Sequence, residues 1–123
     1  MENKLMSLYV FEETDKEELI EQQEKRLKKY CDIKGYDIQS VYNDFNCERN
    51  MSREQLNKLL NDVLNGKVSK VVITDLSIIS KNYEEFMTFA RTLEKNNCTL
   101  TILSAFDMFK YLGKTTTSLF TLF

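Results

Sequence analysis

The sequence predicts an α/β domain with a mostly parallel sheet of about four strands between two layers of helices. Two short and predominantly apolar runs, residues 5–11 and 68–74, are typical of strands that are buried on both faces. Segments with the helical spacing of apolar residues lie between and after these runs, so strands and helices alternate along the chain. Connections of this kind are right-handed and give a parallel sheet with helices on both faces.

The helical segments carry recognisable start and stop signals. T-D-K-E at residues 14–17 and S-R-E-Q at residues 52–55 are capping boxes, and Asn82 can cap a third helix. We expect the first helix to end near Gly35 and the second at Gly66, because glycine readily adopts the left-handed conformation that ends helices.

The remaining strands and the end of the chain are less regular. Residues 36–42 alternate between polar and apolar, as in an edge strand, and residues 99–103 supply a further strand. We therefore expect the two apolar runs, 5–11 and 68–74, to be neighbours at the centre of the sheet. Residues 113–123 form a Thr-rich apolar segment that we expect to begin a helix.

Composition narrows the class of protein. The 123 residues, 42% hydrophobic and 29% charged, suit one soluble domain, and no apolar segment is long enough for a membrane span. The net charge of -2 argues against a free-standing nucleic-acid binder, so we expect DNA binding to be weak or indirect. Three scattered cysteines indicate reduced thiols and a cytoplasmic location. The chain has no His, and we expect no metal or other cofactor.

Ligands of parallel sheets bind beyond the carboxyl ends of the strands, so any chemistry is expected just after residue 11. Acidic side chains follow several of the predicted strands: Glu12, Glu13, Asp44 and Asp75. Such oxygen ligands could hold Mg²⁺ in a regulatory domain. The simpler interpretation is that they are loop residues and charges near helix N-termini, which the helix dipole favours.

Five short motifs then suggest a family. They are YVFEET at residues 9–14, VYNDF at 41–45, SREQLNKLL at 52–60, NGKVSKVVI at 65–73 and LSIISKN at 76–82. Their order and spacing resemble those of the N-terminal catalytic domain of the serine recombinases, the resolvase/invertase family. The resemblance covers nearly the whole chain, from about residue 5 to the end, and implies a resolvase-like fold.

Several positions match polar residues of that family. The family's first strand ends in a motif whose Ser is the nucleophile, and Tyr9 and Thr14 match the ends of this motif. Gln22 falls where the family has a Gln, nine residues after the nucleophile position. Asp44 and Arg53 match an acidic residue after the second strand and an Arg at the start of the next helix.

The departures fall on the positions that carry the family's chemistry. Glu13 stands at the nucleophile position, and Phe11 stands where an Arg is expected. The family attacks a DNA phosphodiester through the Ser hydroxyl, and the transition state needs guanidinium groups around its extra negative charge. Losing one such donor typically costs about 100- to 1,000-fold in rate. The resemblance therefore implies a degenerate site without DNA cleavage.

The last motif departs in the same way. Ser77, Ile78 and Lys81 occupy positions of an Asp and two Arg in the family, while Ser80 matches a Ser that is not the nucleophile. An active recombinase, using the hydroxyl of Thr14, Ser77 or Ser80, is the alternative.

The resemblance also implies assembly. The family uses the segment after its G-K pair, here Gly113-Lys114, as a long helix for dimer contacts, so residues 113–123 would be its truncated start. The large apolar residues near the end are the expected interface: Leu119, Phe120, Leu122 and Phe123. We expect a homo-oligomer, or a hetero-oligomer with a recombinase, acting without catalysis in DNA recombination or mobile-element biology. Folding of this segment onto its own sheet, or truncation of the chain, is the other possibility.

Overall fold

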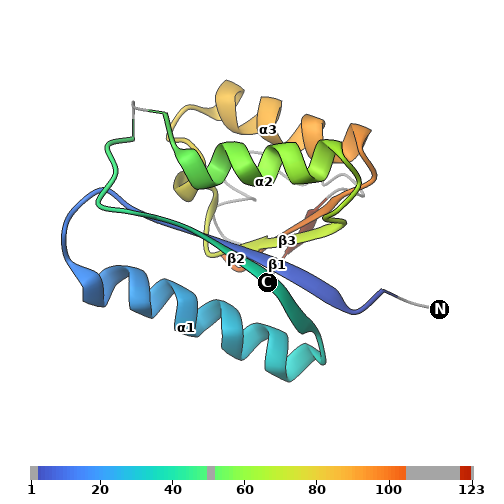
Figure 1. The fold of residues 1–123 in the computed structure, drawn as a ribbon, viewed down its shortest axis with the longest axis horizontal. Helices are drawn as coiled ribbons and strands as arrows, with labels where there is room; N and C mark the ends of the chain where they lie inside the picture. Colours follow the sequence, from blue (N-terminus) through green and yellow to red (C-terminus); the bar gives the residue numbers. More distant parts are fainter. Residues whose placement is uncertain (1–2, 50–51, 105–119, 123) are drawn as a thin grey trace.

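The computed structural model describes residues 3–49, 52–104 and 120–122 (Figure 1). Strands and helices alternate along nearly all of this length, as the sequence predicts. The elements are β1 (Leu5–Glu12), α1 (Glu17–Lys34), β2 (Asp37–Phe45), α2 (Glu54–Leu64), β3 (Lys70–Ile73), the 3-10 turn η1 (Leu76–Ile78), α3 (Tyr83–Lys95), β4 (Thr99–Ile102) and β5 (Phe120–Leu122).

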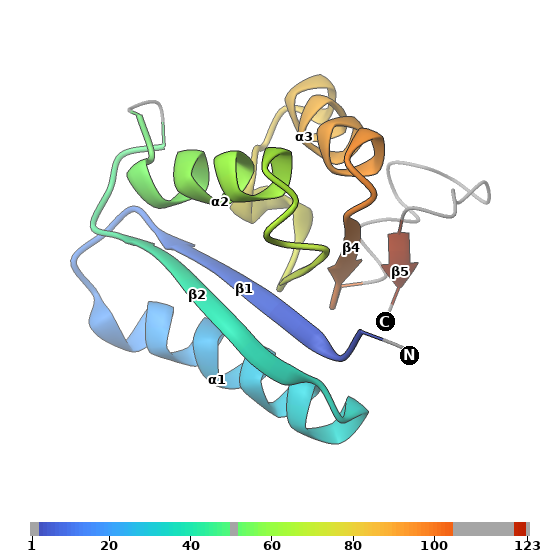
Figure 2. The ribbon, with the colours of Figure 1, turned by 45° about the vertical axis from the view of Figure 1, so that its right-hand side comes forward.

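The strands form a parallel sheet with the order β2-β1-β3-β4-β5. The predicted neighbours β1 and β3 are adjacent inside the sheet, and β2 lies at its edge, so both predictions are confirmed. Helix α1 covers one face, whereas α2 and α3 cover the other (Figures 1 and 2). The predicted three-layer architecture is therefore confirmed.

Each face of the sheet has its own apolar core. On one face, Ile20 and Leu27 of α1 pack against the β1 side chains Leu8 and Val10. On the other face, Tyr9 of β1 belongs to the larger cluster beneath α2 and α3. Neighbouring residues of β1 thus point to opposite faces, which explains why most of its sequence is apolar.

The structure corrects two of the predicted helix starts. α1 begins at Glu17 after Lys16, and α2 begins at Glu54 after Arg53, and neither of these N-cap side chains caps its helix. Thr14 instead donates its hydroxyl to Glu12, at 2.8 Å. The third predicted start is confirmed, because the Asn82 side chain accepts a hydrogen bond from the backbone N–H of Glu85.

The end of the chain also differs from the prediction. Residues 120–122 form strand β5 beside β4, where the sequence predicts a helix. The mixture of Thr, Phe and Leu favours a strand, and the open edge of β4 supplies backbone groups to pair with. Residues 113–119 and 123, which include the predicted interface residues Leu119 and Phe123, lie outside the described part of the chain.

The cysteines are unpaired, as expected of reduced thiols. Cys31 and Cys98 are buried and all three thiols, including Cys47, are free. Burial raises the pKa of the Cys98 thiol to about 12, so it stays protonated near neutral pH.

Among the helices of residues 3–49 and 52–104, none has both the length and the apolar character needed to cross a membrane.

Candidate functional site

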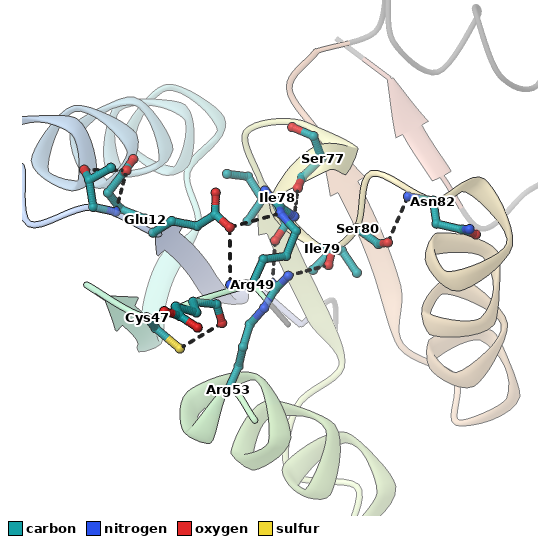
Figure 3. Close-up of polar contacts among 12 residues, drawn as sticks. Glu12, Cys47, Arg49, Arg53, Ser77, Ile78, Ile79, Ser80 and Asn82 are labelled. Atoms are coloured by element: carbon teal, nitrogen blue, oxygen red, sulfur yellow. Dashed lines mark hydrogen bonds and ion pairs between the residues drawn. The ribbon is translucent and has the colours of Figure 1, made fainter. Parts of the chain in front are cut away.

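The candidate site lies where β1, β2 and β3 end, which is the usual ligand edge of a parallel sheet. The loop after β1, the loop after β2 and the turn η1 after β3 meet at this edge. Figure 3 shows Arg53 reaching from the start of α2 towards Ile78 and Ile79, with Arg49 beside it. These two arginines bring most of the positive charge to the site.

Arg53 is buried, with 7% of its surface exposed, and both terminal nitrogens of its guanidinium group donate hydrogen bonds. One terminal nitrogen, Nη1, donates to the carbonyl of Ile78 at 2.7 Å, and the other, Nη2, donates to the carbonyl of Ile79 at 2.9 Å. The guanidinium carbon lies 4.0 Å from the centre of the Phe11 ring, in cation–π contact. Arg53 therefore ties the start of α2 to η1 and to β1.

Asp44, behind Arg53, is a helix cap supplied by a neighbouring strand. Its carboxylate accepts hydrogen bonds from the backbone N–H groups of Gln55 and Leu56, each at 2.9 Å. It also accepts the hydroxyl of Tyr9 at 2.8 Å. A carboxylate satisfies two N–H groups of the first helical turn at once, which explains why α2 needs no cap from Ser52.

Tyr9 remains a neutral hydrogen-bond donor in this cluster. Burial raises the pKa of its hydroxyl well above the usual value, and the Asp44 carboxylate raises it further, whereas Arg53 lowers it. Nη1 of Arg53 also lies 3.5 Å from the Tyr9 hydroxyl. We refer to Tyr9, Asp44 and Arg53 as the buried cluster.

Glu13, at the position that matches the family's nucleophile, lies at the surface. Its side chain is 45% exposed, and Oε1 lies 3.7 Å from Nε of Arg49. The same oxygen accepts a hydrogen bond from the backbone N–H of Arg49 at 3.3 Å. Arg49, whose side chain is only 19% exposed, also donates through Nη1 to the carbonyl of Ser77, while its buried Nε has no hydrogen-bond partner among the described residues. We refer to Glu13, Arg49 and Ser77 as the exposed rim.

Two functional residues were missed from the sequence. Arg49 lies in the polar loop before α2, four residues before Arg53, and its guanidinium carbon is 4.9 Å from the Phe11 ring centre. Gln23, rather than the exposed Gln22, contacts the end of β1: its amide donates to the Phe11 carbonyl at 2.7 Å and accepts from the Phe11 N–H at 3.1 Å. The sequence offered two signals for them: a second Arg four residues before Arg53, and a Gln next to Gln22.

The hydroxyls of the last motif are engaged with local carboxylates. Ser77 donates to Asp75, whose carboxylate also accepts the Ser77 N–H. Ser80 is buried and donates to Glu85 at 2.7 Å. Ile78 contributes its carbonyl to Arg53 and buries its side chain, whereas Lys81 is exposed.

The predicted cluster of carboxylates does not form. Asp44 caps α2, Asp75 caps η1, and Glu12 accepts from the backbone N–H and the hydroxyl of Thr14. Within the part of the chain that the structure describes, no group of three acidic or thiol side chains could hold a metal ion. These carboxylates instead accept hydrogen bonds from nearby donors, so the magnesium alternative gains no support from the described residues.

The fold and site geometry can be compared with known proteins. A family model, described as "Resolvase, N terminal domain", matches residues 12–123. No match is found among the curated proteins.

Solved structures with a similar fold agree with the family match. The chain is similar to the N-terminal catalytic domain of TP901-1 integrase, at 21% identity and a TM-score of 0.74, over 80% of this chain and 77% of that one. It is similar to a resolvase family site-specific recombinase from Streptococcus pneumoniae, at 21% identity and a TM-score of 0.70, over 80% and 70%. It is also similar to the product of the first open reading frame in transposon ISC1904 from Sulfolobus solfataricus P2, at 25% identity and a TM-score of 0.66, over 80% and 66%.

Proposed function

The chain belongs to the resolvase family of serine recombinases, whose domains act in DNA recombination, and we propose that it is a member that does not itself cleave DNA. The observation that carries this proposal is the engagement of Arg53 with two backbone carbonyls. Turning its guanidinium group towards a phosphate would leave both buried carbonyls unpaired, at about 1–3 kcal/mol each. The guanidinium group that would stabilise phosphoryl transfer thus serves to hold the fold together.

Glu13, at the position that matches the family's nucleophile, also supports the proposal. A carboxylate at the position of the family's Ser cannot act as the same nucleophile, and it carries negative charge towards any phosphate placed there. Two like charges at about 4 Å repel by roughly 1 kcal/mol in water and about 4 kcal/mol at the effective dielectric near a protein surface. The contact between Glu13 and Arg49 also partly neutralises the second guanidinium group at this edge.

An active recombinase is the second candidate, and one observation favours it. The Ser77 hydroxyl donates to the Asp75 carboxylate, and the Ser77 carbonyl accepts from Arg49. A hydroxyl beside a carboxylate base and a cation is the arrangement of an activated nucleophile. Asp75 also binds the Ser77 N–H, however, so a local turn that caps η1 accounts for the same geometry.

The two candidates differ in whether a covalent protein–DNA adduct forms. The full chain would be incubated with a pool of random-sequence duplexes and resolved on a denaturing gel, with a relative that retains the Ser as positive control. We expect no adduct. An adduct that disappears in Ser77→Ala but persists in Ser104→Ala would establish the active alternative, since Ser104 lies after β4 and outside the site.

We further propose that the chain acts by self-association or by pairing with a recombinase. The apolar residues Leu119, Phe120, Leu122 and Phe123 support this, since fully burying one such side chain is worth roughly 1.5–3 kcal/mol. Residues 120–122 pair with β4 of the same chain, so we propose that the interface is built on β5 and its flanking residues. Light scattering should show an oligomer for the full chain and a monomer for the pair Leu119→Asp and Phe123→Asp. Leu64→Asp, on the exposed side of α2, is the control that should leave the oligomer intact. A monomeric full chain would refute self-association, and mixing with a recombinase would then test the pairing.

DNA binding should be weak. With a net charge of -2, the chain has few cations to spare for phosphate contacts and releases few counterions on binding. Fluorescence anisotropy with a random duplex near 150 mM salt should give no submicromolar binding, and an affinity tighter than that would contradict weak or indirect DNA contact.

A further inference from the structure

Helix α1 carries a second stripe of side chains beside its core stripe. Arg26, Lys29, Tyr30, Ile33 and Lys34 follow the spacing of a single helical face. Together with Leu103, after β4, they line a hollow of about 510 Å³. This volume lies within the range of small-ligand sites, about 300–1,000 Å³.

The floor of this hollow is apolar and part of it is exposed. Ile33 is 69% exposed, although it is a large aliphatic residue in the middle of the stripe. Tyr30 and Leu103 are partly buried against the apolar core on the α1 face. The Tyr30 ring is stacked with Tyr36, with 6.3 Å between ring centres, so it is held in place. The hollow therefore presents a fixed apolar surface at the side of α1.

The rim of the hollow is basic. Lys34 lies in the last turn of α1, where the helix dipole favours a cation. Arg26 and Lys29 lie more than one turn before the end of α1. The dipole effect fades within one turn, so it does not account for positive charge at these two positions. None of the described residues that line the hollow is acidic. An apolar floor with cations along one side is complementary to a molecule with an apolar body and an anionic group.

We propose that this hollow binds a small amphiphilic anion, with an apolar body against Tyr30, Ile33 and Leu103 and a carboxylate, sulfonate or phosphate group against Arg26 and Lys29. Arginine binds such groups through paired N–H donors and lysine binds them as a point charge. The hollow lies on the α1 face of the sheet, whereas Arg53 and Phe11 belong to the face covered by α2 and α3 (Figure 2). The two sites are therefore separate, and this inference does not depend on the absence of DNA cleavage.

A fluorescent probe of this chemistry, 1-anilinonaphthalene-8-sulfonate, allows a direct test on the full chain. We expect saturable binding to one site, weakened about tenfold or more in the double variant Arg26→Glu and Lys29→Glu, because the anionic group loses both partners. The matched control is Lys25→Glu with Lys58→Glu, which changes the net charge equally at two exposed lysines outside the hollow. Its affinity should stay within about twofold of the unsubstituted chain.

A separate pair of variants tests the apolar floor. This pair keeps the proposal testable even if circular dichroism shows that the double variant does not fold. Ile33→Gln should weaken probe binding, whereas Leu64→Gln, at an exposed leucine of α2, should not. Decanoate should displace the probe, and inorganic phosphate at equal ionic strength should not. Equal weakening in both charge variants, unsaturable binding, or displacement by phosphate alone would each overturn the proposal.

Discussion

The buried cluster and the exposed rim lie against the same aromatic ring but are bonded very differently. In the buried cluster, Arg53 donates to two carbonyls and Asp44 accepts three hydrogen bonds. In the exposed rim, Arg49 leaves Nε without a hydrogen bond and lies 3.7 Å from Glu13. Each region places one guanidinium group near Phe11, so the difference lies in how the remaining donors are used.

This difference explains which family positions the chain retains. Tyr9, Asp44 and Arg53 match polar residues of the family and hold β1, β2, α2 and η1 together. Glu13 and Ser77 stand at positions where the resemblance implies other residues, and their contacts are local or exposed. If the proposed absence of cleavage is correct, the matching polar residues are the ones that hold the fold together.

The largest difference between the two regions should follow from replacing each arginine with methionine, which keeps most of the apolar stem. Arg53→Met leaves the carbonyls of Ile78 and Ile79 unpaired and should lower the free energy of unfolding by about 2–4 kcal/mol. Arg49→Met should cost less than about 1 kcal/mol, because its contacts are partly exposed. Urea denaturation of both variants measures this, and equal losses would remove the distinction between the regions.

Asp44→Ala tests whether the buried cluster acts as the cap of α2. The variant leaves the N–H groups of Gln55 and Leu56 and the hydroxyl of Tyr9 without their acceptor, so it should cost about 2–3 kcal/mol. Asp62→Ala is the comparison, since its carboxylate accepts the Tyr42 hydroxyl at a partly buried position. Thermal melts that place the two variants within error of each other would show that the cap contributes little.

A smaller effect should appear only at alkaline pH. Burial, and the nearby Asp44 carboxylate, raise the pKa of Tyr9 in the folded chain above the usual tyrosine value of 10.0, so the folded state retains this proton to higher pH than the unfolded state. The resulting stability is fully present below pH 10.0 and is lost as the pH rises from there towards the folded pKa. In urea melts between pH 8 and about 11, Tyr9→Phe should therefore lose stability less steeply than the unsubstituted chain. Parallel pH profiles would contradict this prediction.

The sequence predicted the parts of the fold that depend on local pattern. The apolar runs identified β1 and β3 as central strands, and Asn82 was identified as a cap because the backbone N–H that its side chain accepts lies three residues further on. The predicted caps at Thr14 and Ser52 are wrong. Thr14 donates its hydroxyl to Glu12, and Asp44 accepts the Gln55 N–H of α2 in place of Ser52. Asp44 is ten residues from α2, a relationship that only the packing of β2 against α2 creates.

The sequence indicated the sheet edge at which Asp44 and Arg53 lie, but not the hydrogen bonds that they make there. The matched positions Asp44 and Arg53 were identified, but the pairing of Arg53 with Ile78 and Ile79 joins segments 25 and 26 residues apart, which no short motif reveals. Gln23 was missed because two adjacent glutamines differ only in the helical face that they occupy. Arg49 was missed because it lies in a loop with no periodic pattern.

The central claim is that the Arg53 guanidinium group belongs to the fold and is not available to a phosphate. The arginine side-chain ¹H–¹⁵N NMR spectrum of the full chain tests this directly, with Arg53→Lys and Arg49→Lys to assign the signals. We predict separate, slowly exchanging Nη signals for Arg53 that do not move on titration with inorganic phosphate, and faster exchanging signals for Arg49, which contacts the exposed Glu13. Rapid exchange of the Arg53 signals, or a saturable shift of them with phosphate, would contradict the account.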